Sequence, residues 1–272
     1  MKPFLCLQVL ACFLLLVKCS SINSFDWIGG VDSSISSSEE SDEDIEIQPP
    51  EDFIGFQYVA SALKYPYQVA FVLKGKDSVL CQGALISTEW IITTGSCLKK
   101  YGGVSGDWLS AVVGTVSVRN PEAVIRHLSF AVFHPQFDFD TGANDVALVK
   151  IKPIVESKNV KPIKLSNYVH PMETKCKYSS SSENAVYGFS LKLLDPGTCD
   201  KISLPKQMLN YNCAGVGDVQ FMTNTFKTMG SPLVCDERLY SIKTSDGIFT
   251  AVNNIDSWVN SVLEKSIETN LG

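Results

Sequence analysis

From Ile54 onwards the sequence is divided into short apolar runs separated by Gly, Asn, Asp and Ser. The runs are rich in β-branched and aromatic residues and are shorter than typical helices, which favours strands. They lie at Tyr67 to Leu73, Trp90 to Thr94, Ser110 to Val118, His127 to Phe133, Val146 to Ile151 and Leu233 to Ile242. Because turn signals recur regularly between them, this pattern predicts an all-β barrel or sandwich.

The chain closes with a helical pattern rather than another strand. Asn253 and Asn254 are candidate N-cap residues for this helix. The apolar residues that follow them form one helical face: Ile255, Trp258, Val259, Val262 and Leu263. We expect this face to dock onto the β body rather than onto a membrane.

The first residues have the features of a secretory signal. Lys2 precedes an apolar run from Phe4 to Val17, and small residues follow near Cys19. A membrane-spanning helix needs about twenty apolar residues, and Lys18 ends this run too early. The pattern therefore predicts a signal peptide at residues 1–19 and a secreted, extracellular protein.

Residues 20–53 form a strongly acidic segment, with ten carboxylates and no Lys or Arg. From Ile54 to Gly272 the chain has 21 basic side chains (23 minus Lys2 and Lys18) and 19 acidic ones (29 minus ten). We therefore predict an acidic, Ser-rich disordered segment before a nearly neutral body, and no binding to nucleic acid or membrane. The segment is expected to be a solvated spacer, a phosphorylated tail or a tether for a basic partner.

Six cysteines follow the signal. An even number of cysteines in an exported chain predicts disulfides, although the spacings alone leave several pairings open. Zinc is the alternative, but the sequence contains no Cys-x-x-Cys pair. We therefore expect disulfides and no metal or cofactor. The cysteines are Cys81, Cys97, Cys176, Cys199, Cys213 and Cys235.

One stretch ends in Thr93-Thr94-Gly95-Ser96-Cys97, sixteen residues after Cys81. It resembles the "Thr-Ala-Ala-His-Cys" run of the trypsin-like serine proteases. Further stretches resemble the same family in the same order. They are Pro66 to Ala70 ("Pro-Tyr-Gln-Val-Ser"), Asn144 to Lys150 ("Asn-Asp-Ile-Ala-Leu-Leu-Lys"), Cys213 to Gly215 ("Cys-Ala-Gly") and Gly230 to Cys235 (the end of "Gly-Asp-Ser-Gly-Gly-Pro-Leu-Val-Cys").

The resemblance covers essentially Ile54 to Leu263. It implies a trypsin-like domain over residues 54–272, with two six-stranded antiparallel β-barrels and a C-terminal α-helix. It also implies three disulfides: Cys81–Cys97, Cys176–Cys235 and Cys199–Cys213.

The positions that carry the family's catalytic triad are changed. Ser96 stands at the position of the general base and Met229 at that of the nucleophile, and only Asp145 matches the family. A serine hydroxyl does not titrate near neutral pH, and a thioether cannot form an acyl-enzyme. We expect Asp145 to be a hydrogen-bonded carboxylate that accepts from Ser96.

Neighbouring positions depart from the family as well. Thr228 replaces the aspartate that receives the activated N-terminus, Lys227 replaces an oxyanion-hole glycine, and Ser231 replaces a second glycine. The specificity pocket also looks reduced: Thr225 replaces a pocket cysteine, and only eleven residues separate Cys235 from Gly247. His127, His134 and His170 match no catalytic position and are expected at the surface or at strand ends.

These changes predict an inactive serine protease homologue that works by binding. Homologues of this kind are common in invertebrates, and the resemblance suggests such a source. The expected partner is a protein, such as a protease or zymogen of an extracellular cascade or of an immune or reproductive fluid. The alternatives are a decoy that binds protease substrates or inhibitors, and an active serine endopeptidase that uses Ser231. The sequence does not predict an oligomeric state.

Overall fold

The structure is a computed structural model that describes residues 58–60, 62–103, 108–115, 117–199, 210–216, 228–245 and 247–268. The expected signal peptide and acidic segment lie outside the described residues, as do Thr225 and Lys227. No helix in the described part of the chain has the length and apolar character needed to cross a bilayer.

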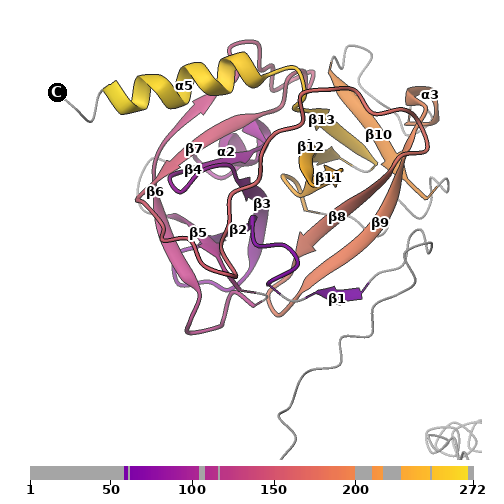
Figure 1. Ribbon diagram of the computed structural model, residues 1–272. Coiled ribbons are helices and arrows are strands. Elements are labelled where there is room, and N and C mark those ends of the chain that lie inside the picture. Colours follow the sequence, from indigo (N-terminus) through magenta and orange to yellow (C-terminus); the bar gives the residue numbers. More distant parts are fainter. Residues whose placement is uncertain are drawn as a thin grey trace, which may run out of the picture. The chain divides into compact units, whose positions relative to one another are not determined.

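The first half of the folded chain forms a closed antiparallel barrel (Figure 1). Its strand order is β2-β3-β4-β7-β6-β5. The barrel closes through the pairing of β2 with β5. Its strands are β2 (Gln68–Leu73), β3 (Val79–Leu85), β4 (Trp90–Thr93), β5 (Leu109–Val113), β6 (Val124–Phe133) and β7 (Ala147–Ile151).

A second antiparallel barrel follows, in the order β9-β10-β13-β12-β11-β8 and closed by β8 on β9. The short β1 (Tyr58–Ala60) adds to β9 as a further strand. The all-β prediction of two six-stranded barrels is therefore confirmed. The strands of this barrel are β8 (Lys175–Ser181), β9 (Val186–Leu194), β10 (Tyr211–Gly215), β11 (Pro232–Cys235), β12 (Arg238–Ser245) and β13 (Ile248–Ala251).

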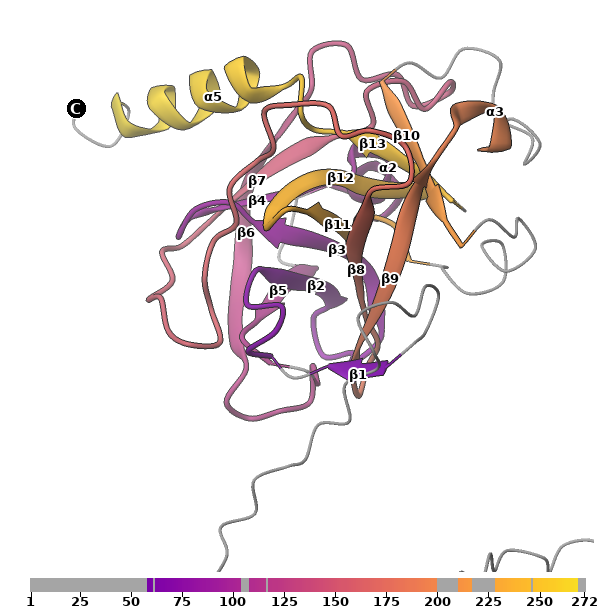
Figure 2. The ribbon, with the colours of Figure 1, turned by 45° about the vertical axis from the view of Figure 1, so that its right-hand side comes forward.

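The linker between β7 and β8 runs along both barrels (Figure 2). Its amides donate to the first barrel, as from Ile163 to the carbonyl of Leu85 at 2.8 Å. Further along, Ser166 donates to the carbonyl of Leu239 in the second barrel at 2.8 Å. These main-chain bonds fix the linker to both barrels.

All three implied disulfides are present: Cys81–Cys97, Cys176–Cys235 and Cys199–Cys213. The six cysteines are at most 2% exposed and pack within the hydrophobic clusters of the barrels. Disulfides of this kind are typical of chains that mature in an oxidising compartment.

The predicted C-terminal helix is α5 (Asp256–Glu268). Ile255 and Val259 are buried in the core cluster, and Trp258 packs against it with its ring 5.0 Å from that of His134. The predicted N-cap is wrong. Asn253 and Asn254 form a turn before the helix, and the carbonyl of Ile255 accepts the first helical bond, from Val259.

The run Leu233 to Ile242 is not one strand but the β11–β12 hairpin. Cys235 pairs with Arg238, and the two residues between them have positive φ angles of 46° at Asp236 and 58° at Glu237. Two consecutive residues with positive φ form the tight turn that matches the twist of a hairpin. An acidic pair inside an apolar run was the sequence signal for this turn.

The strand expected from Ser110 to Val118 ends at Val113. Gly114 follows with φ of 75°, and a Cβ at this position would lie 2.6 Å from a methyl carbon of Val160. The glycine therefore turns the chain where a larger residue would collide with the linker.

Candidate functional site

Ser96 is placed by the short helix α2 (Gly95–Lys100), which begins directly after β4. The disulfide from Cys97 to Cys81 of β3 ties this helix to the barrel. Thr94, at the N-cap, makes no side-chain capping bond, and its buried hydroxyl has no hydrogen-bond partner among the residues that the structure describes. The first turn of α2 therefore needs an acceptor from elsewhere for its free amides.

Asp145 supplies this acceptor. One carboxylate oxygen, Oδ1, accepts from the backbone amide of Ser96 at 2.7 Å, and the other, Oδ2, accepts from the Ser96 hydroxyl at 2.6 Å. The predicted bond between these two residues is confirmed. The carboxylate therefore acts as an external cap for α2.

The geometry around Asp145 is set by the residue before it. Asn144 has a positive φ of 49°, a conformation that Asn tolerates better than most residues. Its side-chain nitrogen donates to the backbone carbonyl of Gln136 at 3.1 Å, and its side-chain oxygen accepts from the side-chain nitrogen of Asn210 at 2.6 Å. These contacts aim the neighbouring carboxylate at α2.

Asp145 is only 3% exposed. Burial raises the pKa of its carboxyl above the usual value, while hydrogen bonds from Ser96 and Gly95 oppose this rise. No cation forms an ion pair with this carboxylate in the described part of the chain. Hydrogen bonds alone therefore stabilise its ionised form.

Met229 lies next to Ser96 and Asp145, so the structure brings the three triad positions together. Its sulfur is 3.6 Å from the hydroxyl oxygen of Ser96. The single hydroxyl proton is committed to the closer Asp145, so the sulfur mainly packs against the oxygen. The Met229 carbonyl accepts from the amide of Gln82 in β3 at 2.8 Å, which joins the two barrels here.

Gly230 allows this close approach of the barrels. It has φ of 86°, and a Cβ on it would lie 1.9 Å from the carbonyl oxygen of Gln82. Only a residue without a side chain fits there.

A polar network behind Met229 was not found by sequence reasoning. The Gln82 side chain is fully buried: its oxygen accepts from Gln68 at 2.6 Å and from the amide of Ser181 at 2.7 Å, and its nitrogen donates to Ser180 at 3.0 Å and to the carbonyl of Ser181 at 3.2 Å. Ser179 also donates to Gln68 at 2.6 Å. The network links β2 and β3 to β8, and the signal for it was a glutamine inside an otherwise apolar strand.

Among the described residues, the site offers hydrogen-bonding groups at the three triad positions. Ser96 and Met229 replace the base and the nucleophile, and Asp145 is the one titratable group of the three. Ser231 is fully buried, and its hydroxyl donates to the carbonyl of Thr228 at 3.2 Å. This arrangement can stabilise local structure, and the described residues place no nucleophile–imidazole pair of the kind that acyl transfer uses at these positions.

All three histidines lie in the described part of the chain, and the contacts recorded for them do not involve Ser96, Asp145 or Met229. His127 is exposed on β6 with Nδ1 3.3 Å from the Ser110 hydroxyl, and His134 follows the end of β6, as expected. The prediction is wrong for His170, which is 2% exposed within the linker.

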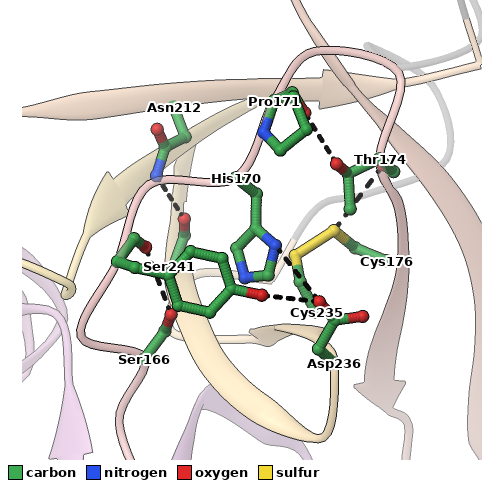
Figure 3. The surroundings of a disulfide bond; sticks show 10 residues. Ser166, His170, Pro171, Thr174, Cys176, Asn212, Cys235, Asp236 and Ser241 are labelled. Atoms are coloured by element: carbon green, nitrogen blue, oxygen red, sulfur yellow. Dashed lines mark hydrogen bonds and ion pairs between the residues drawn. A yellow bond between two sulfur atoms is a disulfide. The ribbon is translucent and has the colours of Figure 1, made fainter.

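Aromatic neighbours bury His170. Its ring lies 4.2 Å from that of Tyr168 and 4.8 Å from that of Tyr240. Nδ1 is 3.5 Å from the carboxylate of Asp236, beside the Cys176–Cys235 disulfide (Figure 3). Burial lowers the pKa of His170, and Asp236 partly opposes this effect.

Metal binding has no support in the described residues, which contain no group of three or more His, Cys, Asp or Glu side chains suited to an ion.

Two closed barrels with the three triad positions between them define a chymotrypsin-like protein. The family model for trypsin matches residues 54–259, so the chain belongs to the trypsin family.

Known relatives agree with this family placement, and a solved structure shares the fold. Trypsin V-A of Rattus norvegicus is 23% identical over 77% of this chain and 89% of its own length. Trypsin-3 of Homo sapiens is 26% identical over 76% of this chain and 71% of its own length. The structure of mouse neuropsin, a serine protease expressed in the limbic system of mouse brain, covers 74% of this chain and 96% of neuropsin, with a TM-score of 0.63 and 19% identity. This last likeness concerns the fold alone.

Proposed function

We propose that this protein is a secreted, non-catalytic member of the trypsin family that acts by binding other proteins. The observation that supports this proposal is the contact of Ser96 with Asp145 and Met229. A hydroxyl and a thioether occupy the places where an imidazole and a nucleophile would meet. Loss of triad members lowers turnover by about a millionfold in a related mechanism.

The expected partner is a protease or zymogen of an extracellular proteolytic cascade, or a protein of an immune or reproductive fluid. The three disulfides and the signal-like N-terminus support export. Surface loops on a rigid scaffold can bind a partner without any triad.

Catalysis is tested with the purified full-length protein, an activated peptide thioester and a fluorophosphonate probe. We expect no turnover above that of buffer and no labelling. Ser231→Ala should behave as the wild type. Turnover or labelling that Ser231→Ala or Ser96→Ala abolishes would contradict the proposal, because it would identify a working nucleophile.

Binding is tested separately by a pull-down from the fluid that contains the protein. The full-length protein is compared with a version that starts at Ile54. A protease or zymogen retained by both forms supports a cascade partner that binds the barrels. Retention of a basic protein by the full-length form alone would instead place binding in the acidic segment.

A further inference from the structure

A groove with a volume of about 510 Å³ lies between three segments of the folded chain. One wall is the stretch that leads into β2, with Leu63, Lys64, Pro66 and Tyr67, and the second is the linker, residues 161–164. The third is the β11–β12 turn, residues 236–238. The groove shares no residue with Ser96, Asp145 or Met229, and its volume suits several side chains of a ligand.

The cations that line the groove outnumber the carboxylates. They are Lys64, Lys161, Lys164 and Arg238, against Asp236 and Glu237. Lys161 and Lys164 are exposed, and neither forms an ion pair with a carboxylate in the described part of the chain.

The two carboxylates already have partners outside the groove. Glu237 pairs with Lys177 at 2.7 Å. Asp236 accepts from the Tyr168 hydroxyl at 2.6 Å and lies beside His170. The positive charge of Lys161 and Lys164 therefore remains in the groove after the internal pairs of the described residues are counted.

The walls of the groove are fixed by main-chain bonds and by a disulfide. The amide of Lys161 donates to the carbonyl of Pro66 at 3.0 Å, and the carbonyl of Lys164 accepts from Leu239 at 2.9 Å. The β11–β12 turn follows Cys235, whose disulfide to Cys176 lies beside Asp236 (Figure 3). A groove that is formed in advance loses little conformational entropy on binding.

We propose that this groove binds an acidic, partly apolar peptide segment of a partner protein. Its carboxylates would pair with Lys161 and Lys164, and an apolar side chain would cover Leu63, which is 54% exposed. This assignment rests on the proposed binding function and names the surface that performs it.

A peptide fits the groove better than a sulfated glycan does. Apolar walls at Leu63, Pro66 and Ile163 lie among the cations. Asp236 and Glu237 at one edge would repel a uniformly charged polyanion. A peptide can place a neutral side chain at this edge and carboxylates at the lysines.

The test measures fluorescence anisotropy of short labelled probes with the full-length protein. The acidic probe is Gly-Asp-Glu-Leu-Asp-Glu-Phe-Gly, its neutral match is Gly-Asn-Gln-Leu-Asn-Gln-Phe-Gly, and labelled heparin is the third probe. The groove variant is Lys161→Glu/Lys164→Glu. The control is Lys99→Glu/Lys100→Glu, which changes the net charge equally at two exposed lysines of α2.

We expect the acidic peptide to bind and to weaken with added salt. The groove variant should lose affinity by about tenfold or more, and the control by less than about twofold. Four results would each overturn the proposal. The neutral peptide binds as tightly as the acidic one, or both variants lose affinity equally. Alternatively, the acidic peptide does not bind, or heparin binds in its place. Thioester turnover is assayed on the same samples, so a failure of the groove is distinguished from a failure of the non-catalytic assignment.

Discussion

The polar network between the barrels gives a quantitative prediction for Gln82→Ala. The substitution removes the acceptor of two buried donors, the Gln68 side-chain nitrogen and the Ser181 amide. A buried donor left without a partner costs about 1–3 kcal/mol. The two donors together predict a loss of about 2–6 kcal/mol in the free energy of unfolding. The bond to Ser180 adds less, because this residue is half-buried and its hydroxyl can turn to water.

Urea unfolding followed by tryptophan fluorescence measures this loss. Trp90 is buried and Trp108 is 70% exposed, so the emission reports on the transition of the core. The matched control is Gln136→Ala, an exposed glutamine whose replacement should change stability by less than about 0.5 kcal/mol. A Gln82 variant as stable as this control would refute the reasoning, because the network would then add nothing to the joining of the barrels.

Three further predictions concern single positions. Gly230→Ala should unfold at a temperature lower by about 10 °C or more in a thermal scan, because its Cβ would collide with the carbonyl of Gln82; a shift within about 2 °C would contradict the close approach. Asp145→Ala should lower the free energy of unfolding by about 1–3 kcal/mol in urea, since it leaves the Ser96 backbone amide unpaired. Asp145→Asn should lose less, because the asparagine side chain can accept from the Ser96 backbone amide and donate to the Ser96 hydroxyl. Equal losses in the two variants would argue against the capping role. Burial lowers the pKa of His170, so the unfolded chain binds a proton on this histidine at a higher pH than the folded chain does. The free energy of unfolding should therefore decrease as pH falls below about 6.5. His170→Phe should flatten that part of the plot of stability against pH, and an unchanged slope would contradict this role of His170.

The sequence predicts most strands of the first barrel because they have a local signal. Short β-branched runs with turn residues between them match β2, β4, β5, β6 and β7, whereas no such run marked β3. The arrangement in two barrels came from the resemblance. The disulfide pairing came from the resemblance rather than from spacing. It is correct because the pairing is a property of the fold, and the fold is shared.

Errors arose where tertiary contacts override the local pattern. His170 has no flanking apolar period, yet two tyrosines and the linker path bury it. The strand from Ser110 was predicted too long because the limit at Gly114 comes from Val160, which is distant in sequence. The groove cations show the same problem: Lys64, Lys161 and Arg238 are far apart in the chain and meet only through the fold.

Asp145 shows why a retained triad residue is weak evidence for catalysis. In this structure its carboxylate caps the first turn of α2, which has no side-chain cap of its own. That capping bond needs an acceptor oxygen at this position, and it does not need an imidazole. An aspartate with this structural role can stay while the base and the nucleophile change, since replacement by a residue without an acceptor would unpair the amide of Ser96. The presence of Asp145 therefore agrees with a binding protein as well as with an enzyme, and the decision rests on Ser96 and Met229.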